Sequence, residues 1–176
     1  MRIRTAVAVP AASAAAAVLL SAAPQSQAVT AARAADLRCA AQSLAVRAKA
    51  VSGDPTVVRV SVTNRSSRAC LVDRVPTVTF GDLDGAALPT PAGGTGTYRL
   101  PAGRAAHADV RTIGDPADPE ARRVAVVTVA ASAAQRGRSF TAAQLGTGPR
   151  VLVWEPVTTW WQPTRAAADR AAGLSR

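Results

Sequence analysis

The only histidine in the chain, His107, is its natural candidate for a general base at neutral pH. It lies in the segment RAAHADV, and Asp109 follows two positions later. Residues two apart on a strand share a face, so these two could form part of a Ser–His–Asp site. No GxSxG elbow accompanies them. A surface histidine is the ordinary interpretation, so the sequence assigns no catalytic residue and predicts no enzyme. A small secreted hydrolase using His107 stays the alternative.

Metal ligands are also scarce. Two cysteines and one histidine are too few for a zinc site. The segment GDLDG (81–85) carries Asp82 and Asp84 at alternate positions, as a calcium loop does, but no carboxylate closes it. A second acidic turn, GDPADPE, covers 114–120. We expect hairpin and loop turns here and no metal or cofactor; two acidic loops meeting around Ca²⁺ is the alternative.

All three tryptophans occur in VLVWEPVTTWWQP, near the end of the chain. Trp160 and Trp161 are adjacent, and adjacent side chains on a strand point to opposite faces. One ring is therefore expected in the core, and the other is a candidate contact for a sugar, polymer or protein. The alternative is that the second ring packs on the tail.

Cys39 and Cys70 are the only cysteines. In an exported protein, an isolated pair usually forms one disulfide. Closing a loop of about 31 residues would stabilise the fold by roughly 3.7 kcal/mol in the chain-entropy treatment. Two free thiols are the alternative.

The first 28 residues resemble a secretory signal peptide in layout. Arg2 and Arg4 precede an apolar, alanine-rich run over 6–23, and small residues follow. We expect a signal-peptide helix over 1–28, cleaved after Ala28 or after Ala34, with 29–36 as a linker. The protein is thus expected to be secreted.

A membrane anchor is the alternative to cleavage. A spanning helix needs about 20 strongly apolar residues, whereas this run is mostly alanine and is interrupted by Pro10. Lipid attachment at Cys39 is disfavoured by Arg38, because lipoprotein signals place small residues before the cysteine. No stable membrane span is expected after signal cleavage.

The formal net charge is +10 for the whole chain, or +8 without Arg2 and Arg4. The arginines are scattered, and the longest basic run is Arg122-Arg123. Nucleic-acid binders cluster their basic residues, so no nucleic-acid partner is expected. The excess charge implies a general attraction to polyanions such as cell-wall polymers and acidic lipids.

Short segments of alternating apolar and polar residues lie between turns rich in Gly, Pro, Asn and Asp. This pattern predicts antiparallel strands in an all-β, immunoglobulin-like sandwich over residues 37–157. The expected strands are 43–51, 56–63, 77–80, 97–100, 106–112, 123–131 and 150–156. A short helix is expected around 141–145. The tail, 158–176, has helical propensity but little apolar surface, and a poorly ordered end is expected.

The stretch NRSSRACLVDRVPTVTFGDLDG (64–85) is interpreted as scaffold: a turn at Asn64, a cysteine, a proline-led strand and a hairpin turn. Its pattern resembles the DUF4232 domain of exported proteins and lipoproteins of high-GC Gram-positive bacteria. The residues that carry the resemblance are Cys39, Thr63-Asn64, Cys70-Leu71, Val75-Pro76-Thr77-Val78, Asp84-Gly85 and Leu100-Pro101-Ala102-Gly103. The last motif has Ala102 inserted, and Asp73-Arg74 stands where the family commonly has glycine. The resemblance implies a secreted sandwich and no assigned activity.

These features together predict a secreted, non-enzymatic binding or interaction module at the cell envelope. Its expected partner is a cell-wall polymer or an envelope protein. A purely structural surface protein is a further alternative to the hydrolase.

Overall fold

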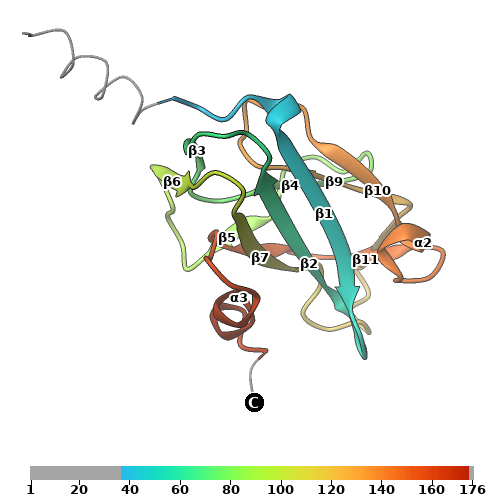
Figure 1. Ribbon diagram of the computed structural model, residues 1–176. Coiled ribbons are helices and arrows are strands. Elements are labelled where there is room, and N and C mark those ends of the chain that lie inside the picture. Colours follow the sequence, from blue (N-terminus) through green and yellow to red (C-terminus); the bar gives the residue numbers. More distant parts are fainter. Residues whose placement is uncertain (1–36, 175–176) are drawn as a thin grey trace, which may run out of the picture.

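The structure, a computed structural model, describes residues 37–174. The expected signal peptide and linker lie outside these residues, as do positions 175 and 176. The elements, shown in Figure 1, are η1 (Ala41–Ser43), β1 (Leu44–Val51), β2 (Asp54–Asn64), β3 (Cys70–Asp73), β4 (Thr77–Phe80), β5 (Leu88–Thr90), β6 (Thr97–Leu100), β7 (Ala105–Arg111), β8 (Arg122–Val124), β9 (Val126–Ala130), β10 (Arg138–Thr141), α2 (Ala142–Leu145), β11 (Val151–Val153), β12 (Val157–Thr159) and α3 (Arg165–Ala171).

The larger sheet has five strands in the order β1-β2-β7-β12-β5. Its second strand, β2, alternates strictly from Val58 onward: Val58, Val60 and Val62 are buried, whereas Arg59 and Ser61 point to the other face. The valines favour an extended backbone because β-branched side chains pack well on a pleated surface. Alternation therefore gives this sheet one apolar face and one polar face.

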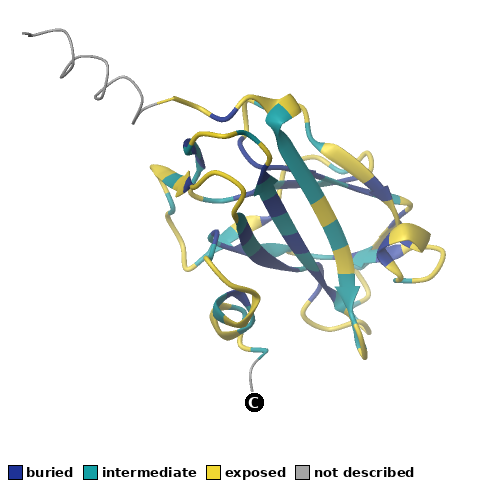
Figure 2. Cartoon of the chain, in the orientation of Figure 1, coloured by how far each residue is buried: buried dark blue, intermediate teal, exposed yellow. Residues whose placement is uncertain are grey.

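A second layer covers the apolar face. It contains the three-stranded sheet β10-β9-β4, flanked by the two-stranded pairs β11-β8 and β3-β6. Val78, Phe80, Val127 and Val129 from this layer join the β2 valines in one buried cluster. Figure 2 shows the buried positions as dark bands along β2, β7 and β9. The expected all-β architecture with a core between sheets is confirmed.

One strand pair differs from the expected antiparallel pattern. β12 pairs with β5 in parallel, with Val157 opposite Leu88 and Thr159 opposite Thr90. Short hairpins impose antiparallel pairing only on strands that follow each other closely. A long stretch of chain separates β5 from β12, and it leaves the relative direction of the two strands free.

The seven expected strand segments all contain strands, and the helix expected near 141–145 is α2. Thr141 caps this helix by accepting from the Gln144 N–H, and Gly146 ends it in the left-handed region with φ 86°. The expected strand 123–131 is divided at Ala125, so that β8 and β9 join different sheets. The strands that sequence reasoning missed are β3, β5, β10 and β12, each only three or four residues long.

The turn after β2 is organised by a buried asparagine, Asn64. Its side-chain amide donates to the carbonyls of Arg68 (2.7 Å) and Leu100 (3.1 Å). Its side-chain oxygen accepts from the Ser66 N–H at 2.9 Å and from the Ser66 hydroxyl at 2.7 Å. Asn64 thus has a scaffold role and fixes the approach of β3 and β6 to the end of β2.

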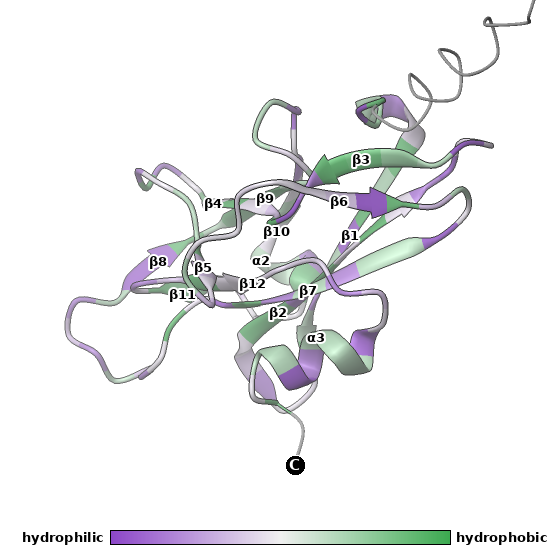
Figure 3. Cartoon of the chain, turned by 90° about the vertical axis from the view of Figure 1, so that its left-hand side faces the viewer, coloured by the Kyte–Doolittle hydropathy of each residue, from purple (hydrophilic) through white to green (hydrophobic). Residues whose placement is uncertain are grey.

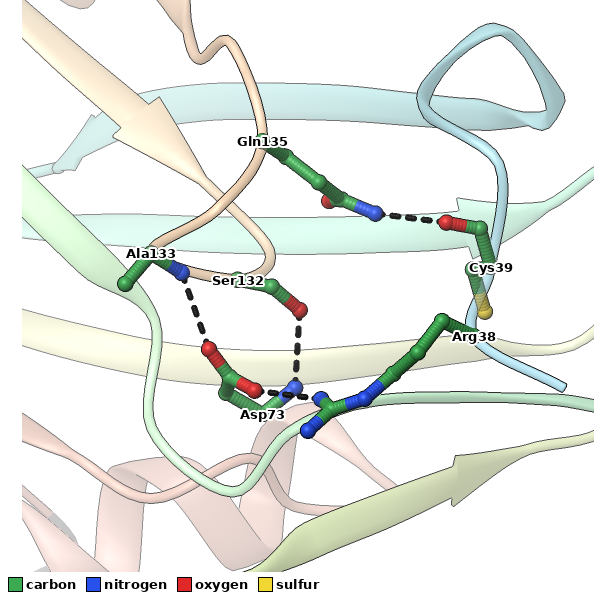
Figure 4. A network of polar contacts seen from close by, with 6 residues as sticks. All are labelled: Arg38, Cys39, Asp73, Ser132, Ala133 and Gln135. Carbon is green, nitrogen blue, oxygen red and sulfur yellow. Dashed lines mark hydrogen bonds and ion pairs between the residues drawn. The ribbon is translucent and has the colours of Figure 1, made fainter. Parts of the chain in front are cut away.

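The predicted disulfide between Cys39 and Cys70 is confirmed, with Cα atoms 4.9 Å apart. A polar network beside it holds the same edge together (Figure 4). Asp73 pairs with the Arg38 guanidinium and accepts from the Ala133 N–H at 2.9 Å, while its own N–H donates to Ser132. The Gln135 side chain donates to the Cys39 carbonyl at 2.7 Å.

The sheet continues to Thr159, two residues past the expected domain limit, and helix α3 follows. Thr164 caps α3 by accepting from the Ala167 N–H. The helix lies on the polar face of the larger sheet, against β7 (Figure 3). Ala168 is its one buried residue. The helical propensity of the tail is thus realised, and the scarcity of apolar surface is offset by polar contacts to the sheet.

Candidate functional site

The polar face of the larger sheet carries the residues with chemical potential. Strand pairing sets Lys49 of β1 opposite Arg59 of β2, and Arg59 opposite Asp109 of β7. Directly opposite residues in an antiparallel pair have side chains on the same face, about 5 Å apart. Two cations and one carboxylate therefore form a row across three strands.

A second row runs parallel to the first. Arg47 lies opposite Ser61, and Ser61 lies opposite His107. Because rows on one face are two residues apart along a strand, the two rows are about 7 Å apart. The sheet thus presents a small array of basic and polar side chains.

These rows line a large open groove with a volume of about 1540 Å³. The groove extends around the β1 edge towards β10 and α2, and α3 contributes at its other side. Asp109 is the one carboxylate among its lining residues. The basic residues that line it are Arg47, Lys49, Arg59, Arg65, Arg138 and Arg165.

Five of these six cations have no carboxylate partner among residues 37–174. Among residues 37–174, Arg59 is the only one of the six that forms an ion pair. The side chains of Arg47, Lys49, Arg65, Arg138 and Arg165 belong to exposed residues. Several unneutralised cations around one hollow produce a positive potential that attracts anions.

Arg59 lies between two carboxylates. Its Nε and Nη2 atoms donate to Asp169 Oδ1 of α3 at 2.9 Å and 2.8 Å, and Asp109 Oδ1 is 4.0 Å from its Nε. Burial raises the pKa of Asp109 to about 7, and the hydrogen bond and negative charge of Asp169 add to this shift. Arg59 and Arg165 act in the opposite direction.

His107 and Asp109 share a face, as the sequence predicts, and Ser61 is the cross-strand neighbour of His107. Within residues 37–174, however, the His107 side chain forms no hydrogen bond to either residue; its backbone pairs with Gln162. Burial and the nearby Arg165 charge lower the pKa of the imidazole. The Asp109 carboxyl is directed to Arg59 and Asp169 and does not orient His107.

The two acidic turns serve as turns. In the second, Asp115 and Asp118 accept the N–H groups of Ala117 and Glu120, at 2.9 Å and 2.8 Å. Nowhere in the described part of the chain do three or more His, Cys, Asp or Glu residues come together as a metal-binding group. The alternative of two acidic loops meeting around a cation is therefore not realised among these residues.

The adjacent tryptophans divide between the two faces. Trp161 is 3% exposed and belongs to the core cluster, and its Nε1 atom has no acceptor among residues 37–174. Trp160 is partly exposed; its Nε1 donates to the Pro91 carbonyl at 3.2 Å, and the Arg74 guanidinium lies 4.4 Å from the ring centre. Neither ring lines the groove. A ligand-contact role stays a prediction for Trp160.

A smaller cavity of about 280 Å³ lies elsewhere, between the hairpin turn at Asp84 and the β11–β12 connection. Phe80, Leu83 and Trp154 form its apolar wall. Its charged residues are all exposed, so the cavity lacks the buried polar group that would fix a ligand.

Sequence reasoning missed the clustering of the groove cations. Arginines that are scattered along the chain converge because the β1–β2 register aligns alternate positions of two strands. The sequence did contain a pattern that could have predicted this cluster. Arg47 and Lys49 are two residues apart in one strand segment, and Arg59 lies in the next segment, after the SGDP turn. The expectation of a dispersed charge was therefore wrong for this face of the molecule.

Comparison with known proteins gives a family and no activity. Residues 39–161 match the family model described as "Domain of unknown function (DUF4232)". No curated protein and no solved structure matches the chain significantly. Among the described residues, none of the helices has the length and apolar character needed to cross a membrane.

Proposed function

Because the chain belongs to the DUF4232 family, whose description names no activity, we propose from the groove that it is a secreted, non-enzymatic binding module for an anionic polymer of the cell envelope. The observation that carries the proposal is the convergence of six cations and one carboxylate on a single groove. Secretion is supported by the layout of residues 1–28.

The spacing of the cations favours a ligand with several charges. Lys49 and Arg59 are cross-strand neighbours about 5 Å apart, and Arg47 is about 7 Å further along. A single small anion would engage one or two of these side chains. A polymer with repeated phosphate or carboxylate groups would engage most of them at once and release bound counterions.

A nucleic acid fits this groove less well. Proteins that bind single strands combine a basic groove with aromatic side chains on which bases stack. The one phenylalanine of the groove, Phe140, is 7% exposed and belongs to the core, and the Arg138 guanidinium covers its ring at 5.1 Å. The groove thus offers charge without a stacking platform.

The test compares two double variants of equal charge. Arg47→Gln with Lys49→Gln removes two groove cations, whereas Arg99→Gln with Arg123→Gln removes two exposed cations outside the groove. The probe is long-chain polyphosphate, with uncharged dextran as the negative control. Binding is measured by titration between about 50 and 200 mM salt.

We expect the groove variant to bind polyphosphate about tenfold or more weakly and to lower the slope of log K against log salt by about 2. The control variant should stay close to the unmodified protein. Equal losses in both variants would mean general attraction and would overturn the proposal. Tighter binding of a single-stranded DNA than of polyphosphate would overturn it in favour of a nucleic-acid partner.

A small secreted hydrolase is the second candidate, because Ser61, His107 and Asp109 lie on one face. The engagement of Asp109 by Arg59 and Asp169 counts against it. Ester hydrolysis measured before and after Ser61→Ala separates the two functions: a loss of activity in the variant would support the hydrolase.

A further inference from the structure

Helix α3 is held to the sheet mainly by polar contacts. It has seven residues, and Ala168 is its one buried side chain. A single buried alanine stabilises a docked helix only slightly, since the gain scales with the apolar area removed from water. Isolated helices of this length are also unstable in water. The contacts of Asp169 to the sheet therefore decide whether α3 stays docked.

Those contacts include a carboxyl pair. Asp109 is 2% exposed, and its Oδ2 atom has no hydrogen-bond donor among residues 37–174. Its Oδ1 atom and Asp169 Oδ1 of α3 both approach the Nε atom of Arg59, at 4.0 Å and 2.9 Å, so the two carboxyl groups share one guanidinium. Two ionised carboxylates carry only acceptors, so a hydrogen bond between them requires a proton on one of them, and such a bond to Asp169 is among the causes that raise the pKa of Asp109. Arg59 alone cannot neutralise both charges, and its stronger contact is with Asp169.

The surrounding charged groups do not remove this requirement. Arg165 of α3 lowers the pKa of Asp109, yet burial and Asp169 outweigh it and raise that pKa to about 7. Lys49 of β1 lies one strand further away, opposite Arg59. The pKa of His107, on β7 itself, is lowered by burial and Arg165, which disfavours a positive charge on the imidazole.

We propose that a proton shared between Asp109 and Asp169 latches α3 to β7, and that loss of this proton loosens the helix and weakens the groove for anions. The claim that anion binding weakens rests on the proposed function, because Asp109 lines the groove beside Arg59. Ionised Asp109 competes with an anionic ligand for Arg59. The groove would therefore hold its polymer in mildly acidic surroundings and release it in alkaline ones.

The direction with pH follows from linkage. The pKa of Asp109 is raised above the ordinary carboxyl value of 3.8, so the docked state holds a proton that the undocked state gives up. The contribution of this proton to the docking of α3 is therefore fully present below pH 3.8 and is lost as the pH rises through about 7. At a pH well above 7 this contribution to docking is lost completely.

The experiment follows amide hydrogen exchange of α3 from about pH 5.5 to 8.5, with intrinsic rates corrected and β2 amides as the internal reference. We expect protection of α3 relative to β2 to fall about tenfold or more in the unmodified protein. Asp109→Asn mimics the protonated carboxyl and should make α3 protection independent of pH. Asp115→Asn, in an exposed loop, is the matched control and should keep the full pH dependence.

Two outcomes would overturn the latch: α3 protection that does not change with pH in the unmodified protein, or a pH dependence that survives Asp109→Asn. If Asp109→Asn does not fold, Asp169→Asn gives the same comparison from the partly exposed partner. His107→Gln should leave the pH dependence of α3 protection in place. Loss of that dependence in this variant would assign it to the imidazole and overturn the latch. Polyphosphate affinity measured over the same pH range tests separately whether anion binding weakens. A protein that binds polyphosphate at no pH would contradict the proposed function. The latch itself is tested by hydrogen exchange of α3 alone.

Discussion

Arg138 donates a hydrogen bond of 3.1 Å to the backbone carbonyl of Val46 and so connects β10 to β1. These are edge strands of two different sheets, and no backbone pairing joins them. Unpaired edges promote association between molecules, and a charged side chain placed across an edge opposes it. Arg138 thus has a structural role at the end of the groove besides its charge.

Arg138→Ala is expected to destabilise the domain by about 1 kcal/mol, because one hydrogen bond to a backbone carbonyl and the packing on Phe140 are lost. Self-association should also increase. Urea unfolding and light scattering measure the two effects. Arg136→Ala, at an exposed arginine two residues before Arg138, is the control, and identical behaviour of the two variants would contradict the role assigned to Arg138.

Asn64→Ala is expected to cost about 2–4 kcal/mol, because it leaves the Arg68 and Leu100 carbonyls and the Ser66 N–H without their side-chain partner. Asn64→Asp retains the acceptor and loses both donated bonds, so it should fall between Ala and the unmodified residue. Ser67→Ala, three residues further along the same turn and exposed, should change the unfolding free energy little. Tolerance of Asn64→Ala would show that the turn does not depend on its side chain.

Replacing Cys39 and Cys70 together by serine is expected to lower the unfolding free energy by about 3–4 kcal/mol, since the unfolded chain regains the entropy of a long loop. Chemical denaturation of the double variant, with and without reductant, measures this. Arg38→Ala removes the neighbouring ion pair with Asp73 and should cost under about 1 kcal/mol. A double serine variant with an unchanged midpoint would mean that the polar network alone holds this edge.

Trp161→Ala is expected to cost about 3–5 kcal/mol because it empties part of the core, while Trp160→Ala, at a partly exposed ring, should cost about 1 kcal/mol. Trp161→Phe should cost less than Trp161→Ala, because it keeps most of the ring and removes an N–H that has no acceptor among residues 37–174. Thermal unfolding of the three variants gives the order. Equal losses for Trp160→Ala and Trp161→Ala would contradict the division of the two rings.

Prediction from the sequence succeeded where a pattern is local. The valine alternation of 56–63, the cysteine pair and the short helix around 141–145 all depend on residues whose own chemistry determines the outcome. It failed for β3, β5, β10 and β12, which have three or four residues each and were not set apart from the turns beside them by a clear alternation of their own. Their backbone is fixed by partners far along the chain.

The candidate site was harder to predict for the same reason. The sequence identified His107 and Asp109 as neighbours on one face, and this was correct. It did not predict Asp169 beside Asp109, since α3 and β7 are 60 positions apart at these residues. Nor did it place Arg47 and Lys49 next to Arg59 without the strand register.

The position of β12 in the larger sheet also affects how the protein is made. The last strand along the chain lies between β7 and β5, which were synthesised long before it. Until Val157–Thr159 emerge, β7 has one unpaired side and β5 has no neighbour in the sheet. The larger sheet therefore cannot be completed progressively from its first strand, and its centre stays open until β12 has joined β7 and β5.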